Sequence, residues 1–316
     1  MISKSIKVSI LVITYNHKNY LEKCLESILE QKTTFPFEIL IHDDVSTDGT
    51  TEIVKRYVAL YPDKVRCILE EKNVYSQGIS PTLLLIPLIR GQYVAFCEGD
   101  DFWSDPFKLQ KQVDFLDTHP DYVACCHQVT KHNLYKHEDT LFTGRYNDSD
   151  VTTEEMIAWD KDDQYIHLNS MLHRRSILDH LPEYITMKNR PLGDMPYYVY
   201  LTICGKVRFF AKPISVYNFG IPGSWIARGK NYQDYRSHMA RTNGWIHLYN
   251  VIDRCTGYKY HSCIVENRRR YEKQKLKIWI RWHVPLVVPI YKRMKQIFGR
   301  RGDVVSPLFR YEILLF

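Results

Sequence analysis

The sequence predicts an α/β fold in which a mostly parallel sheet is flanked by helices. Segments with the composition of strands and of helices alternate over residues 8–97, as in wound α/β sheets. The strand-like segments 8–13 and 93–97 are almost continuously apolar, as expected of parallel strands covered on both faces. The segment 20–29 instead repeats apolar residues every three or four positions, as one face of a helix does.

The elements follow in order along the chain. Apolar runs predict strands at residues 8–13, 37–41, 65–69, 93–97, 122–126, 168–173, 207–210 and 214–217. Apolar spacing and capping residues predict helices within residues 20–29, 53–58, 81–89, 107–116 and 197–204. Residues 131–163 are polar and acidic, and we expect a variable loop with one short helix there.

The C-terminal part of the chain carries the basic charge. The whole chain has a net charge of +7, whereas residues 264–316 alone hold 13 Lys or Arg and only four Asp or Glu. Tryptophans alternate with these bases, which favours a helical, amphipathic segment on an anionic membrane surface. A solvated helix face and a basic patch for nucleic acid are the alternatives. We expect the membrane surface and no nucleic acid as partner, and we place a domain at 1–230 and this basic segment at 231–316.

The same features predict where the protein works. The eight cysteines form no C-x-x-C pair and several lie in apolar runs, so we expect reduced thiols. The first apolar run is too short for a signal peptide, and Pro285 and Pro289 interrupt the apolar run of the tail. We therefore expect a cytoplasmic protein that attaches peripherally to the inner face of the plasma membrane.

Three carboxylates, Glu98, Asp100 and Asp101, surround Gly99 directly after the predicted strand 93–97. Like charges this close raise one another's pKa, and a hard divalent cation with oxygen ligands relieves their repulsion. The glycine lets the turn approach a ligand. A solvated acidic turn is the alternative. The sequence thus indicates a metal and phosphate site at the carboxyl end of a strand, where open α/β sheets bind ligands.

A second acidic cluster, Asp43, Asp44 and Asp48, ends the predicted strand 37–41. In a parallel sheet the two strand ends lie on the same edge, so both clusters can border one crevice. Asp48 also fits a turn and helix cap, which is the interpretation we favour for it. Glycine-rich phosphate loops of the G-x-G-x-x-G and G-x-x-x-x-G-K-[ST] types are absent from the sequence.

Residues 8–16, 43–50 and 98–103 together resemble the inverting glycosyltransferases of family 2, which have the GT-A fold and use nucleotide-diphosphate sugars. The run 97–116 resembles a bacterial branch that builds capsular and other surface polysaccharides. The similarity covers about residues 6–228. It implies a nucleotide-binding half at 1–130 and an acceptor half at 131–230.

The resemblance also implies roles for residues that match the family's motifs. Tyr15 and Asn16 would belong to the nucleotide-sugar site, where Tyr15 packs against the nucleobase and Asp44 hydrogen-bonds it. Asp100 and Asp101 stand at the DxD position, which touches ribose and the Mn²⁺ or Mg²⁺ that bridges the diphosphate. Glu98 stands where the family often has Asp, and its role is left open.

The candidate catalytic base is Asp194, which with Gly193 resembles the family's acidic motif. A helix cap before Pro196 is its structural alternative, and both can hold at once. Trp103 and Trp225 are candidate acceptor platforms or, equally, packing residues.

Other residues fit the pattern less directly. His127, His167 and His173 are expected to be structural, because no pair of them has metal spacing. Where the branch often has Arg and a nearby His, this chain has Asn218-Phe219-Gly220, which puts a diphosphate contact there in doubt.

We expect an inverting transferase that moves a sugar, most simply from a UDP-sugar, to a hydroxyl of a lipid-linked or growing glycan. One carboxylate takes the acceptor proton while others hold the cation, so Asp194 and the pair Asp100 and Asp101 have separate tasks. The alternatives are transfer to a lipid phosphate and a nucleotide-sugar-binding protein without turnover.

Overall fold

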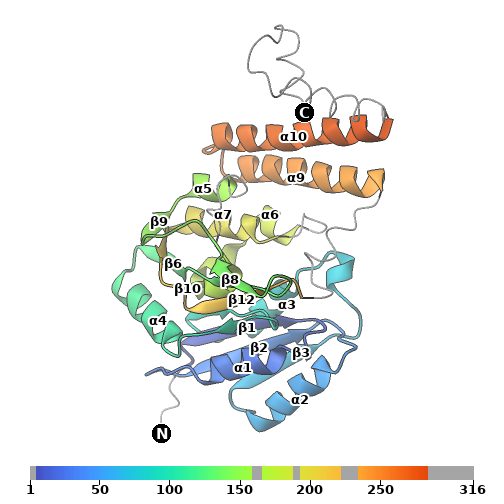
Figure 1. Ribbon diagram of the computed structural model, residues 1–316. Helices are drawn as coiled ribbons and strands as arrows, with labels where there is room; N and C mark the ends of the chain where they lie inside the picture. Colours follow the sequence, from blue (N-terminus) through green and yellow to red (C-terminus); the bar gives the residue numbers. More distant parts are fainter. Residues whose placement is uncertain (1–4, 159–165, 188–192, 222–233, 284–316) are drawn as a thin grey trace. The chain divides into compact units, whose positions relative to one another are not determined.

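The computed structural model describes residues 5–158, 166–187, 193–221 and 234–283 (Figure 1). Contacts within the chain divide it into two compact units, Met1–Arg228 and Gly229–Phe316. Each unit is described by itself.

The first unit is built on an eight-stranded sheet with the order β3-β2-β1-β4-β10-β6-β11-β9. Its strands are β1 (Val8–Thr14), β2 (Phe37–Asp43), β3 (Val65–Leu69), β4 (Tyr93–Phe96), β6 (Tyr122–His127), β9 (Ser149–Val151), β10 (Leu172–Arg174) and β11 (Lys206–Phe210). Strands β3, β2, β1 and β4 are parallel, whereas β10 runs antiparallel to both of its neighbours. Strand β11 is parallel to β6, and β9 is antiparallel to β11. The predicted α/β fold, a mostly parallel sheet flanked by helices, is confirmed, although three of the strand pairings are antiparallel and the sheet is therefore mixed.

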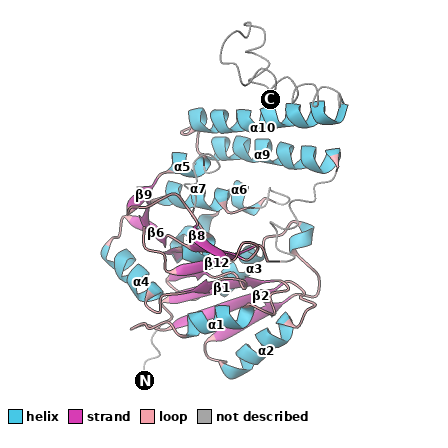
Figure 2. Cartoon of the chain, viewed as in Figure 1, coloured by secondary structure: helices cyan, strands magenta, loops and turns pink. Residues whose placement is uncertain are grey.

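Helices flank this sheet (Figure 2). They are α1 (Leu21–Leu29), α2 (Thr50–Leu60), α3 (Pro81–Leu85), α4 (Lys108–Thr118), α5 (Thr153–Ile157), α6 (Glu183–Thr186) and α7 (Met195–Cys204). Short 3₁₀ turns occur at η1 (Tyr75–Gln77), η2 (Ile86–Leu88), η3 (Leu168–Ser170) and η4 (Arg175–His180). Chain reversals between strands and helices place the polar turns after β1, β2 and β4 at one edge of the parallel half.

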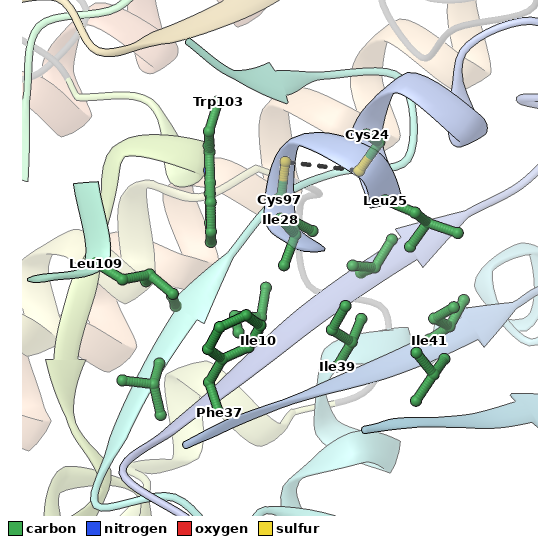
Figure 3. Close-up of a cluster of buried hydrophobic side chains, with 14 of the residues drawn as sticks. Ile10, Cys24, Leu25, Ile28, Phe37, Ile39, Ile41, Cys97, Trp103 and Leu109 are labelled. Carbon is green, nitrogen blue, oxygen red and sulfur yellow. Dashed lines mark hydrogen bonds between the residues drawn. The ribbon is translucent and has the colours of Figure 1, made fainter. Parts of the chain in front are cut away.

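The main core lies between the parallel strands and helices α1, α2 and α4. Alternate residues of β1 and β2, such as Ile10, Ile39 and Ile41, point into it, because side chains alternate between the faces of a strand (Figure 3). The other face is also covered, and this explains why β1, β2 and β4 are apolar on both sides. The core thus fixes the strand ends that carry the predicted acids.

A second, four-stranded sheet has the order β5-β12-β7-β8. Its strands are β5 (Phe102–Trp103), β7 (Thr130–Asn133), β8 (Glu138–Leu141) and β12 (Ser215–Phe219). The expectation of a loop with one helix at 131–163 was therefore wrong, since β7, β8 and β9 lie in or overlap that region beside helix α5. The polar composition misled because β8 is exposed along its whole length and has no apolar alternation to show.

The second unit contains helices α9 (Tyr235–Cys255) and α10 (His261–His283), which pack against each other. The rings of Trp245 and Tyr271 stack between them with centroids 5.5 Å apart. The predicted helical character of the basic segment is confirmed for these helices, while its continuation at 284–316, with Pro285 and Pro289, lies outside the described residues. In the parts of the chain that the structure describes, no helix is long and apolar enough to cross a membrane.

Candidate active site

The acidic turn at 98–101 leaves the end of β4 and lies against the end of its neighbour β1. The N–H of Gly99 donates to the carbonyl oxygen of Ile13 at 2.9 Å. A Cβ on Gly99 would lie only 2.8 Å from Thr14 Oγ1 and 3.0 Å from His17 Nδ1. Glycine is therefore required here by close approach, because a larger residue would push the turn away from β1.

Asp101 is the buried member of this turn. Its Oδ1 accepts the backbone N–H of Asn218 at 3.1 Å, and its Oδ2 accepts the side-chain amide of Asn169 at 2.9 Å. Burial, reinforced by the charges of Asp100 and Glu98, raises the pKa of Asp101 well above its ordinary value. Both oxygens of Asp101 thus have protein partners, and the side chain anchors the turn from within.

Asp100 is partly open to solvent, with its side chain 16% exposed. Its carboxylate lies 3.6 Å from Nε2 of His17, and its backbone carbonyl accepts the side-chain amide of Asn218 at 2.6 Å. The buried atoms Thr14 Oγ1 and His17 Nδ1 have no hydrogen-bond partner among the described residues. Buried polar atoms without partners point to a ligand or water beside the turn.

The structure brings Asp194 to the acids of β4, although it lies far away in the sequence. Burial raises the pKa of Glu98 well above its ordinary value, and the nearby charges of Asp100 and Asp194 raise it further. Asp194 stands at the first turn of α7 without a side-chain capping bond there. The hydroxyl of Tyr198, one turn later in α7, donates to Asp194 Oδ2 at 3.4 Å. The helix therefore holds Asp194 near enough to Glu98 for its charge to raise the pKa of Glu98.

The acids after β2 are engaged by the protein itself. Asp44 is buried, and its two oxygens accept the backbone N–H groups of Val74 at 2.7 Å and Tyr75 at 3.1 Å. Asp48 accepts the N–H of Thr50 at 3.0 Å and that of Lys18 at 3.0 Å, which matches the turn interpretation favoured for it. Asp44 keeps an ordered carboxylate at the strand edge, where a nucleobase contact remains our prediction.

Asn16 ties the turn after β1 to the turn after β2. Its backbone has a positive φ of 58°, which asparagine tolerates better than most residues. Its N–H donates to Ser46 Oγ at 2.8 Å, and its side-chain oxygen accepts the N–H of Thr47 at 2.8 Å. Tyr15, half-buried, precedes it on the same turn. The two predicted nucleotide-sugar residues thus lie at the edge where the acidic turns meet.

Trp103 is a packing residue, so its proposed role as an acceptor platform was wrong. Its side chain is 4% exposed and belongs to the main core (Figure 3). Its ring N–H donates to the carbonyl of Asn169 at 3.1 Å, and the ammonium of Lys108 lies 4.2 Å from the ring centroid. A short strand pairing buries this ring, which the sequence around it did not reveal. The other candidate, Trp225, lies outside the described residues.

Three polar residues of the site were not singled out for it by the sequence. Asn169 and Asn218 hold the acidic turn, and His17 lies beside Asp100. The sequence marked Asn218 only as a departure from the family pattern, and that departure was the one feature that could have pointed to its role. His17 directly follows Asn16 in the polar turn, whereas nothing in the sequence marks Asn169.

The three histidines expected to be structural, His127, His167 and His173, are buried. Burial lowers the pKa of His173 to about 4 and that of His167 to about 4. His167 nevertheless lies near the acids, because its Nδ1 is 3.8 Å from Asp101 Oδ2. Glu98, Asp101 and His167 offer ligand atoms within 4.8 Å of one another.

The donor set at this edge fits a divalent cation. Carboxylate oxygens are the ligands that Mn²⁺ and Mg²⁺ take in proteins. Glu98 and Asp100 supply such oxygens, and burial together with the nearby charges of Asp100 and Asp194 disfavours the charged form of Glu98 and raises its pKa. The unpartnered Thr14 Oγ1 and His17 Nδ1 border the same turn. A cation would therefore reduce the repulsion between these neighbouring carboxylates.

Solved structures place the fold. The chain superimposes on TarS of S. aureus in complex with UDP-GlcNAc with a TM-score of 0.59 and 16% identity, over 88% of this chain and 73% of TarS. It also matches the mannosyltransferase PcManGT from Pyrobaculum calidifontis in complex with GDP-Man and Mn²⁺, with a TM-score of 0.52 and 16% identity, over 96% of this chain and 77% of that chain. These likenesses confirm the GT-A fold.

Sequence comparisons place the family. An uncharacterized protein of Mycobacterium tuberculosis is 32% identical over 82% of this chain and 71% of its own length. WfaP of Escherichia coli, a UDP-Glc:α-D-GlcNAc-diphosphoundecaprenol β-1,3-glucosyltransferase, is 30% identical over 44% of this chain and 51% of its own length. The model of glycosyl transferase family 2 matches residues 9–181. The chain that carries this site is therefore a glycosyltransferase and belongs to glycosyl transferase family 2.

Proposed function

We propose that this protein is a cation-dependent inverting glycosyltransferase that moves a sugar from a UDP-sugar to a hydroxyl of a lipid-linked or growing glycan during surface-polysaccharide synthesis. One observation carries the proposal. At the carboxyl edge of the parallel strands, burial and the charges of Asp100 and Asp194, which come from two distant segments, together raise the pKa of Glu98.

Inversion by a single displacement requires a base on the acceptor side. The acceptor hydroxyl forms a bond to the anomeric carbon while the bond from that carbon to the diphosphate breaks. Asp194, exposed at the start of α7, is the carboxylate that we assign to take the hydroxyl proton. Tyr198 donates to the same carboxylate and keeps it oriented. The proton ends on Asp194 and the electron pair leaves with the nucleoside diphosphate.

The donor side is assigned to the turns after β1, β2 and β4. Of the two cation ligands predicted from the sequence, Asp100 and Asp101, we keep Asp100 and assign Glu98 in place of Asp101, because both oxygens of Asp101 already accept hydrogen bonds from the protein. Asp100 and Glu98 would hold Mn²⁺ or Mg²⁺, which supplies Lewis-acid stabilisation of the leaving diphosphate when it is bound. Asp101 contributes to this site by anchoring the turn. Tyr15, Asn16 and Asp44 border the same edge and would receive the nucleoside. TarS and PcManGT, which share the fold, were solved with nucleotide sugars, and PcManGT with Mn²⁺.

Two further features support the proposed acceptor and the proposed location at the membrane. WfaP, a relative over less than half of this chain, is named for transfer to a sugar on a lipid diphosphate. Helix α10 exposes tryptophans and carries many bases, which suits a peripheral position on the inner face of the plasma membrane. A lipid-linked acceptor would present its sugar at that surface.

Thermal denaturation of the purified chain tests the proposal. It is measured with UDP, GDP, CDP and dTDP, each with Mn²⁺ or with EDTA. A ligand at about a hundred times its dissociation constant stabilises a fold by about 2.7 kcal/mol, which moves the melting temperature by degrees. We expect a Mn²⁺-dependent rise with UDP. A rise with another nucleotide would change the donor, and no rise with any of the four would refute the proposed site.

A further inference from the structure

We propose that Asn218 is a positioning residue that holds the acidic turn from strand β12 and thereby sets the cation affinity of Asp100. The inference rests on the proposed function, since it concerns the cation of that site. It extends that function by proposing that a residue of the second sheet positions the turn that binds the cation.

Asn218 contacts both aspartates of the turn at once. Its side-chain amide donates to the backbone carbonyl of Asp100 at 2.6 Å, and its backbone N–H donates to the carboxylate of Asp101 at 3.1 Å. One bond fixes the backbone of the partly exposed Asp100, and the other fixes the side chain of the buried Asp101. Together they hold the backbone that carries the Asp100 side chain.

Asn218 has a fixed position because its strand β12 pairs with a neighbouring strand on each side. It pairs with β5 through Ser215 and Val216, opposite Trp103 and Phe102, which directly follow the acidic turn. It also pairs in parallel with β7. The acidic turn therefore leads directly into β5, the strand that pairs with β12. The same strand pairing that buries Trp103 also brings Asn218 to the turn.

A short neutral amide suits this position. The turn already carries the charges of Glu98, Asp100 and Asp101, and an amide donor stabilises its backbone without cancelling the negative charge that attracts a cation. Arginine at this position would bring a competing positive charge against the turn. The identity of the residue at 218 therefore matters for cation binding. Partners that orient a metal-binding residue commonly change metal affinity about 10- to 100-fold when they are mutated.

The test is a Mn²⁺ titration of the full chain with saturating UDP, in which electron paramagnetic resonance measures free Mn²⁺. Asn218→Ala removes only the side-chain bond, and we expect Mn²⁺ affinity to fall about tenfold. UDP binding in EDTA should stay unchanged. Asn218→Arg should weaken Mn²⁺ binding at least as much. The matched control is Asn133→Ala, because Asn133 lies in the same sheet and its side-chain oxygen accepts the local N–H groups of Tyr135 and Lys136.

The outcomes separate the two proposals. If the wild-type chain binds Mn²⁺ with UDP and Asn218→Ala binds it within twofold as tightly, the role of Asn218 is refuted while the proposed function stands. If the wild-type chain binds no Mn²⁺, both proposals fail. A loss of affinity equal to that of Asn133→Ala, with an equal fall in melting temperature, would make Asn218 merely structural. Should Asn218→Ala not fold, Asn218→Ser replaces it under the same criteria.

Discussion

Asn169 donates its side-chain amide to Asp101 at 2.9 Å, and both residues are buried. The same asparagine accepts the hydroxyl of Ser215 at 2.9 Å and, through its carbonyl, the ring N–H of Trp103 at 3.1 Å. It therefore joins the acidic turn, the second sheet and the main core through one side chain and one peptide group. Removing this partner would leave a buried carboxylate oxygen without a hydrogen bond, which lowers the stability of the fold.

Asn169→Ala should lower the free energy of unfolding by about 2 to 4 kcal/mol. The change leaves a buried oxygen of Asp101 without its donor and the Ser215 hydroxyl without its acceptor. Urea unfolding measures the loss. Asn133→Ala, which breaks bonds within a surface turn, should cost about 1 kcal/mol or less. Equal losses in the two variants would contradict the bridging role.

Gly99→Ala should disturb the site as well as the fold. The new Cβ would meet buried Thr14 at 2.8 Å, and a β-branched residue in a strand has little freedom to move aside. We expect a loss of about 1 to 3 kcal/mol in stability and a clear loss of UDP binding in Mn²⁺. Thermal denaturation with and without UDP checks both. Gly257→Ala serves as control, since its Cβ would touch nothing within 4 Å and its positive φ should affect stability alone.

Asp194→Asn should abolish transfer while sparing donor binding. The amide cannot accept the hydroxyl proton, and general-base catalysis typically contributes a factor of about 10² to 10⁴. The substitution keeps the size of the side chain and the position of α7. Activity is measured as nucleotide release with an acceptor, and UDP binding by thermal denaturation. Unchanged turnover in Asp194→Asn would assign the base to another carboxylate, with Glu98 the next to test.

The sequence predicted the parallel half of the fold well, because strands covered on both faces leave uninterrupted apolar runs such as 8–13 and 37–41. It failed at β8, whose exposed residues carry no such pattern, and at Trp103, whose burial follows from pairing with a strand more than a hundred residues later. The acidic residues were found because like charges at a strand end are unusual. Asn169 was not, since one asparagine reveals nothing until the fold places its partners.

Lys108 should make stability depend on pH. Its side chain is fully buried over Trp103, and burial lowers its pKa to about 7 from 10.5. The Lys108 amine therefore binds its proton more tightly in the unfolded chain than in the folded one. The resulting loss of folding stability is complete below pH 7 and declines as the pH rises toward 10.5. Relative to Lys108→Met, the wild type should gain about 2 kcal/mol of unfolding free energy between pH 7 and pH 9. Lys111→Met, at an exposed neighbour, should leave the pH dependence unchanged.

Helix α10 provides the last prediction, which concerns the membrane. Trp279 and Trp282 are each 45% exposed and Leu276 is exposed beside them, at spacings of three residues that give one apolar stripe. The helix also contains seven Lys or Arg and two Glu. Indole rings favour the lipid interface, and the bases are attracted to anionic headgroups.

The full chain should therefore float with vesicles that contain phosphatidylglycerol and remain unbound with pure phosphatidylcholine. Changing Trp279 and Trp282 together to Ser should weaken this binding about tenfold or more, because each ring contributes buried apolar area. Added salt should weaken it too, since surface charges are screened. Tyr146→Ser removes a ring of the first unit that is even more exposed, and it should leave vesicle binding unchanged. Salt-sensitive binding to DNA, without binding to either vesicle, would assign the basic helix to nucleic acid instead.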